Sequence, residues 1–79
     1  MPRTILTFIN LHQLLSAEKR LRERREAHLK LRTTPTPPGL SASICGMSLE
    51  LLQPDQLPEI LQYLKADKLE PEAVHELDA

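Results

Sequence analysis

The sequence has few cysteines, aromatic residues and glycines, which normally cross-link a small domain, fill its core with rings and allow tight turns. Its 79 residues include one cysteine, two glycines, one phenylalanine, one tyrosine and no tryptophan. The single Cys45 excludes an intramolecular disulfide and, with no second thiol, makes a poor metal site, which argues for a reducing compartment. No run approaches the roughly 18 apolar residues that cross a bilayer, so we expect no membrane span.

Leucine, in contrast, is abundant and accounts for sixteen residues. Aliphatic side chains with so few aromatic ones favour helices over sheet. We therefore predict an all-helical chain whose marginal stability would gain from a partner or from self-association. Partial disorder of the isolated chain is the alternative.

Charge is unevenly distributed along the chain. Residues 1–40 contain eight Lys or Arg and three Glu, a balance of +5, whereas residues 41–79 contain two Lys and eight Asp or Glu, a balance of −6. Such asymmetry indicates contact with nucleic acid, a membrane or an oppositely charged partner, or docking of the two halves on each other. With the prolines, it divides the chain into a basic amphipathic helical segment at 1–32, a Pro-rich linker at 33–46 and an acidic segment of short helices at 47–79.

The stretch 4–32 contains neither glycine nor proline. It predicts one long helix, or two helices joined near Ser16, which with Glu18 resembles an N-cap and an acidic first turn. The first 17 residues, with Arg3 and no acid, also resemble a weak secretory or mitochondrial leader. Because polar residues interrupt the apolar run, we expect a cytoplasmic or nuclear protein, with mitochondrial targeting as the minor alternative.

Leu11, Leu14 and Leu15 form an LxxLL pattern, in which the leucines lie on one ridge of a helix that can enter an apolar groove. The pattern is similar to the motif with which coactivators engage nuclear receptors. The alternative is a core-facing helix, which shows the same spacing.

Arg32, Pro35 and Pro38 match an SH3-ligand pattern, since polyproline II has three residues per turn. A stiff linker that binds no receptor is the alternative. Thr34 and Thr36 each precede a proline, which makes them candidate phosphorylation sites. Phosphate there would add about −1.5 to −2 charges per site and could pair with nearby arginines.

The acidic half contains the most regular helical pattern, with Pro54 or Pro58 suited to a first helical turn. A further apolar stripe at 73–77 completes a predicted helical hairpin. The candidate partner-binding residues of the predicted helix follow the i, i+3, i+4, i+7 rule and are Leu57, Ile60, Leu61 and Leu64.

A cluster of basic residues precedes the prolines. It is dense enough to act as a nuclear-localisation or phosphate-binding patch, but interleaved glutamates dilute it and no aromatic residue is placed to stack on bases. We expect weak nucleic-acid binding at most from segment 19–32, with a solvated helix face as the alternative. The cluster consists of Lys19, Arg20, Arg22, Arg24 and Arg25.

The stretch 43–51, followed by the predicted helix at 57–64, is similar to the signature region of the MLLE domain at the C-terminus of poly(A)-binding proteins. The resemblance implies a peptide-binding module in which Gly46, Met47, Leu49 and Glu50 contact the bound peptide. The stretch departs from that signature because it lacks the lysine and has Ser48 where the family has leucine.

His12, His28 and His75 are far apart in the sequence and form no metal or nucleophile pattern. We therefore expect neither an enzyme nor a cofactor. The sequence predicts a small interaction adaptor or regulatory subunit that acts through leucine-rich helices on a protein partner, which would be an SH3-type partner if the proline motif is used. The nucleic-acid factor and the MLLE-like module are the alternatives.

Overall fold

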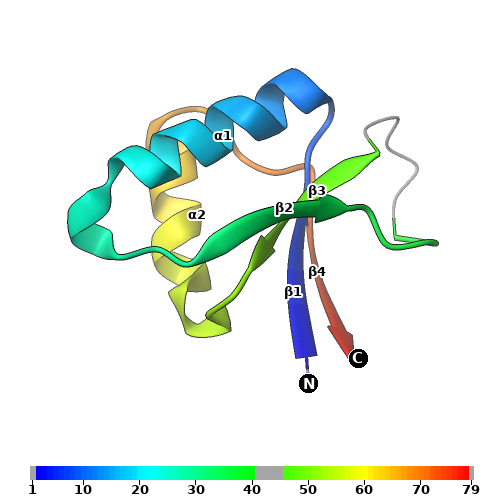
Figure 1. Cartoon of the computed structure of the whole chain (residues 1–79). Coiled ribbons are helices and arrows are strands. Elements are labelled where there is room, and N and C mark those ends of the chain that lie inside the picture. The colour runs from blue at the N-terminus through cyan, green and yellow to red at the C-terminus, as the bar shows by residue number, and fades with distance from the viewer. Residues whose placement is uncertain (1, 41–45, 79) are drawn as a thin grey trace.

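The fold is an antiparallel sheet with helices packed on one face (Figure 1). The structure is a computed structural model that describes residues 2–40 and 46–78. Within these residues, β1 (Pro2–Thr7) leads into α1 (Leu11–Glu23), and β2 (Leu31–Pro35) and β3 (Met47–Leu51) follow. The chain then forms α2 (Leu57–Ala66) and β4 (Ala73–Asp78), with short 3₁₀ turns at Arg25–Ala27 and Pro54–Gln56.

The strands lie in the order β2-β3-β1-β4, and every neighbouring pair is antiparallel. In the registers, Leu6 pairs with Leu49 of β3 and with Val74 of β4, and Thr33 of β2 also pairs with Leu49. A βαββαβ chain with this strand order has the ferredoxin-like arrangement. β1 and β3 are therefore central, and β2 and β4 form the two edges.

The core lies between one sheet face and the two helices. Alternate strand residues such as Leu6, Leu49 and Leu51 face the helices, because successive side chains of a strand point to opposite faces. From the helices, Leu14, Leu21, Ile60 and Leu64 are buried against them. All of these side chains are at most 2% exposed.

α1 begins one residue after Asn10, whose side chain accepts a hydrogen bond from the Gln13 N–H at 2.8 Å. This bond satisfies one of the free donors of the first turn. The predicted helix start at Ser16 is therefore wrong, since Ser16 lies inside α1. The helix also ends at Glu23, so the basic segment is not helical as far as Arg32.

The prediction of an all-helical chain is wrong, because four strands replace predicted helix or linker. Residues 2–7, expected in the first helix, form the central strand β1, and the end of the predicted hairpin is β4. The first three residues of the predicted proline-rich linker, 33–35, belong to β2, where Pro35 is tolerated at the end of an edge strand. The helix predicted at 57–64 is present as α2, with Pro58 in its first turn.

Residues 47–51 of the stretch that resembles the MLLE signature form strand β3 rather than part of a helical domain. In this strand Leu49 is fully buried, and Glu50 is engaged by two arginines. Cys45 and the rest of 41–45 lie outside the described residues. Across 2–40 and 46–78, neither helix is long and apolar enough to cross a membrane.

Candidate functional site

The connection between β2 and β3 is pinned where it leaves and re-enters the sheet. The Thr36 N–H donates to the Gly46 carbonyl at 2.9 Å, and the hydroxyls of Thr36 and Ser48 share a hydrogen bond of 2.6 Å. Gly46 itself is exposed. Because Cys45 is one peptide bond away from Gly46, the sequence attaches the chain's only thiol to this pinned point.

The start of β3 and the start of α1 lie at the same end of the sheet (Figure 1). β1 and β3 run antiparallel with Leu6 opposite Leu49, so the end of β1 that leads toward α1 lies beside the start of β3, which follows Gly46. α1 begins two residues after Ile9. The first turn of the helix therefore stands at the end of the sheet that carries Gly46.

This end of the molecule carries exposed apolar side chains beside the exposed Asn10 and His12. Of the five large apolar side chains that are exposed in the described part of the chain, three gather here: Ile9 (61% exposed), Leu11 (49%) and Leu15 (49%). Leu11 and Leu15 are one helical turn apart and lie on one face of α1. We refer to these three residues as the α1 apolar patch.

An ion-pair cluster lies on the sheet face remote from the helices. The Glu50 carboxylate accepts from Arg3 Nε at 2.9 Å and from Arg32 Nη2 at 2.9 Å, and its side chain is only 8% exposed. Hydrogen bonding from Arg3 is the main cause that lowers the pKa of Glu50; burial opposes it, and Arg32 adds to it. The same contact raises the pKa of the Arg3 guanidinium. Glu50 thus ties β3 to both of its neighbouring strands.

Glu50→Gln is expected to reduce stability at neutral pH and to flatten its fall in acid. Because the folded-state pKa is depressed from 4.5, the carboxylate stabilises the fold above about pH 4.5, and this contribution is lost as pH falls through the folded-state pKa. Urea unfolding of the wild type and the variant at a series of pH values measures the difference. Glu23→Gln, which changes an exposed carboxylate of α1, is the matched control. Parallel pH curves for wild type and Glu50→Gln would contradict the assignment.

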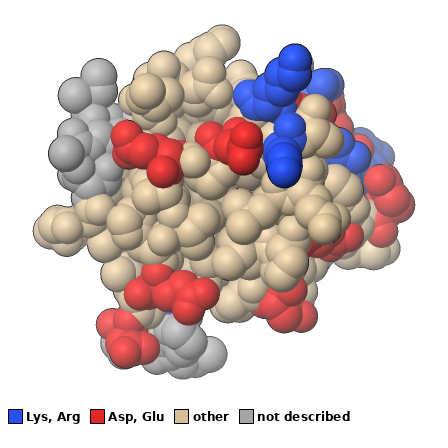
Figure 2. Space-filling model, turned by 180° about the vertical axis from the view of Figure 1, so that it is seen from behind, with Lys and Arg blue, Asp and Glu red and all other residues tan. Residues whose placement is uncertain are grey.

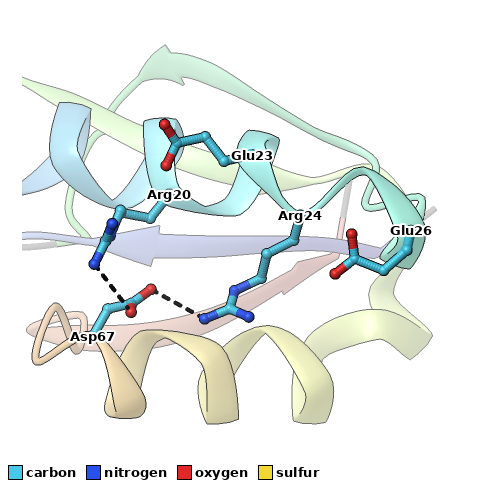
Figure 3. A pocket seen from close by; sticks show the side chains of 5 residues that line it. All are labelled: Arg20, Glu23, Arg24, Glu26 and Asp67. Atoms are coloured by element: carbon cyan, nitrogen blue, oxygen red, sulfur yellow. Dashed lines mark hydrogen bonds and ion pairs between the residues drawn. The ribbon is translucent and has the colours of Figure 1, made fainter.

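A cleft of about 330 Å³ separates the end of α1 from α2 (Figure 3). Arg20 and Arg24 converge from α1 on Asp67 at the end of α2, at 3.5 and 3.4 Å. The Arg24 guanidinium also lies 4.1 Å from the centre of the Tyr63 ring. Glu23 and Glu26 complete the lining. With two arginines against three carboxylates, the cleft holds the helices together and has no excess positive charge for an anion.

The basic and acidic halves of the sequence form most of their ion pairs with each other. Of the five ion pairs in the described residues, four join a basic residue of the first half to an acid of the second half. The remaining pair, Arg22 with Glu18 at 3.0 Å, lies within α1. Two carboxylates, Glu50 and Asp67, therefore dock the two halves on each other.

The structure separates the predicted partner-binding leucines. Leu14, Ile60 and Leu64 are fully buried in the core, and Leu57 packs against it. Leu61 is half-buried and lines a shallow cleft with Lys65 and Pro71. The members of the set that a partner can touch most freely in the folded chain are Leu11 and Leu15.

The proline motif belongs to the edge of the sheet. Arg32 and Pro35 are in β2, whereas Pro38 follows it in an exposed turn. The Thr34 side chain is buried in β2, and the Thr36 hydroxyl shares a hydrogen bond with the Ser48 hydroxyl. Binding of an SH3-type partner and phosphorylation at these positions stay predictions.

The predicted basic patch is dispersed by folding. Arg20 and Arg24 turn toward Asp67, and Arg22 toward Glu18, whereas Lys19 and Arg25 form no ion pair within 2–40 and 46–78. Figure 2 shows Lys and Arg side chains gathered at the upper right of the face seen from behind, with Asp and Glu spread over the rest of that face.

The sequence alone did not predict the hydrogen bonds of Thr36 with Gly46 and Ser48. It also did not predict the ion-pair cluster of Glu50 with Arg3 and Arg32. The opposite charges were visible, but only the register β1–β3–β2 brings them together. Residues 2–40 and 46–78 contain no group of three or more His, Cys, Asp or Glu side chains that could hold a metal ion.

A family model described as "Putative Se/S carrier protein-like" matches residues 3–76, which is almost the whole chain. No curated protein and no solved structure gives a significant match.

Proposed function

The chain belongs to the Se/S carrier protein-like family, and from this premise we propose that it carries one sulfur or selenium atom bound covalently to Cys45. The observation that carries the proposal is the match over 3–76, a range that contains the only cysteine. The thiolate is the nucleophilic form of sulfur in proteins. Because the thioethers of Met1 and Met47 have no ionisable hydrogen, Cys45 is the one sulfur of the chain suited to this role.

Loading is a thiol–disulfide type of exchange. The Cys45 thiolate attacks the outer sulfur of a persulfide, the donor's S–S bond breaks, a new S–S bond forms at Cys45, and the donor leaves as a thiolate. The transferred sulfur keeps its oxidation state, so the step needs no added oxidant or reductant. Selenium bound to a donor thiol would move in the same way. Delivery repeats the exchange with an acceptor thiolate as the attacking group.

The geometry around Gly46 supports this role. A carrier group has to be reached by two other molecules in turn, and Gly46 is exposed at an end of the sheet that also presents the α1 apolar patch. The hydrogen bonds from Thr36 anchor the neighbouring backbone in the sheet. The residue that follows Cys45 in the sequence is thereby held at the start of β3.

The proposal is tested by loading the purified protein with inorganic polysulfide and measuring its intact mass after desalting. We expect a gain of sulfur that dithiothreitol removes and that alkylation of the thiol beforehand prevents. A parallel reaction with selenide and a disulfide-activated Cys45 tests selenium. The proposal fails if no sulfur is bound, or if sulfur still binds to protein whose Cys45 was alkylated before the polysulfide was added.

A carrier exchanges its cargo with other proteins, so the proposed function includes protein partners. The adaptor or regulatory role, the absence of enzyme activity, the location in cytoplasm or nucleus and weak nucleic-acid binding through 19–32 stay predictions.

A further inference from the structure

We infer that the α1 apolar patch, together with the cations that follow it on α1, docks the protein that donates sulfur or selenium to this chain. The inference rests on the proposed function. The partner fitted by this surface has an apolar pocket edged by Asp or Glu side chains. Its chemical class is an enzyme that removes sulfur from cysteine and holds it as a persulfide on its own thiol.

Exposed apolar side chains are grouped at the start of α1. Single exposed apolar residues are ordinary on protein surfaces, whereas a contiguous patch marks an interaction site. Ile9, Leu11 and Leu15 lie together at the start of α1, while the other two exposed ones, Leu52 and Val74, lie after β3 and on the edge strand β4. Leu11 and Leu15 have the i, i+4 spacing with which helices insert into apolar grooves.

Positive charge lies beside the α1 apolar patch. Arg3, Arg20, Arg24 and Arg32 are engaged by Glu50 and Asp67 of the second half of the chain. Lys19, one turn after Leu15, is exposed and has no ion-pair partner in the described residues. Arg22, on the same side of α1 as Leu11 and Leu15, is 55% exposed, pairs with Glu18 of the same helix and also donates to the Leu31 carbonyl at 3.3 Å. The surface beside the patch therefore retains positive charge that acidic side chains of a partner would complement.

The α1 apolar patch lies at the same end of the sheet as Gly46, the residue after Cys45. The patch lies at the end of the sheet at which Gly46 leads into β3, since β1 runs antiparallel to β3 and α1 begins shortly after β1 ends (Figure 1). A donor held on the patch meets the chain beside the residue that follows Cys45. The cleft between α1 and α2 lies at the opposite end of α1, away from Gly46. Its arginines also pair with Asp67.

The experiment compares two routes of loading in the intact chain. A pyridoxal-phosphate-dependent cysteine desulfurase with ³⁵S-labelled L-cysteine supplies a protein-bound persulfide, and inorganic polysulfide supplies a donor that needs no docking. We expect Leu11→Glu with Leu15→Glu to slow loading from the desulfurase by about tenfold or more at limiting donor. Loading from polysulfide is expected to be unchanged. Lys19→Glu is expected to slow the protein route by a few-fold and to weaken its salt dependence.

Leu52→Glu is the matched control, because Leu52 is equally exposed (53%) but lies beyond β3. The inference is overturned if the double variant and wild type load equally from the desulfurase, if Leu52→Glu slows loading equally, or if the desulfurase loads neither protein. It is also overturned if sedimentation shows a wild-type dimer that the double variant dissociates, since the patch would then bind a second copy. If polysulfide loads no protein at all, the proposed carrier function fails instead.

Discussion

Leu14→Ala is expected to lower the free energy of unfolding by about 2–5 kcal/mol, whereas Leu15→Ala is expected to change it by about 0.5 kcal/mol. The two leucines are adjacent in the LxxLL motif, but Leu14 is fully buried between α1, α2 and the sheet, while Leu15 is 49% exposed. Truncating Leu14 removes apolar contacts and leaves a cavity that the surrounding side chains fill only in part. Truncating Leu15 removes a side chain that already contacts water.

The size of the chain makes the Leu14 effect severe. Small domains bury a modest share of their surface, and domain stabilities of about 5–15 kcal/mol leave little reserve at this length. We expect Leu14→Ala to be partly unfolded near physiological temperature. Urea and thermal unfolding followed by circular dichroism measure both variants, and Leu15→Ala serves as the control of equal chemistry. Equal losses of stability would contradict the placement of α1 on the sheet.

Cys45→Ser is expected to abolish loading with sulfur or selenium. A serine hydroxyl is not ionised near neutral pH and forms no persulfide, so no other side chain of the protein can take over the exchange. Intact mass after treatment with polysulfide, and ³⁵S incorporation from the desulfurase, should both fall to background. The substitution changes a single atom.

Met47→Leu is the matched control for the loss of a sulfur atom, because Met47 is the next sulfur-containing residue in the chain and packs at the edge of the core. We expect this variant to load like wild type. Both variants should give the circular dichroism spectrum of wild type. Retained loading of Cys45→Ser would rule out the Cys45 sulfur as the carrier atom.

The helix at 57–64 could be predicted because its signal is local. Leu57, Ile60 and Leu64 repeat at helical spacing, and Pro58 falls where a first helical turn tolerates it. The same kind of signal placed Leu14 on an apolar helix face, although the true helix start is set by the Asn10 cap. Local periodicity therefore predicted helix in these two segments, whereas the start of α1 was predicted at the wrong residue.

The sheet could not be predicted in the same way. Its central strand β1 pairs with residues about seventy positions away in β4, so its stability depends on contacts that no local pattern displays. Leucine, a helix former, occupies strand positions such as Leu6, Leu31 and Leu49, and Pro35 ends β2. Short strands rich in leucine and bordered by proline look like helix or linker until their partners are known.

The sequence by itself determined the chemistry that is available: one thiol, few aromatic residues and a basic half followed by an acidic half. Only the tertiary structure decided how these features are used, because antiparallel pairing and helix packing bring together residues far apart in the chain. It places Glu50 between Arg3 and Arg32 and Asp67 against Arg20 and Arg24, so most of the charge asymmetry holds the halves together. It also buries Leu14 and leaves Leu11 and Leu15 exposed at the end of the sheet that leads to Cys45.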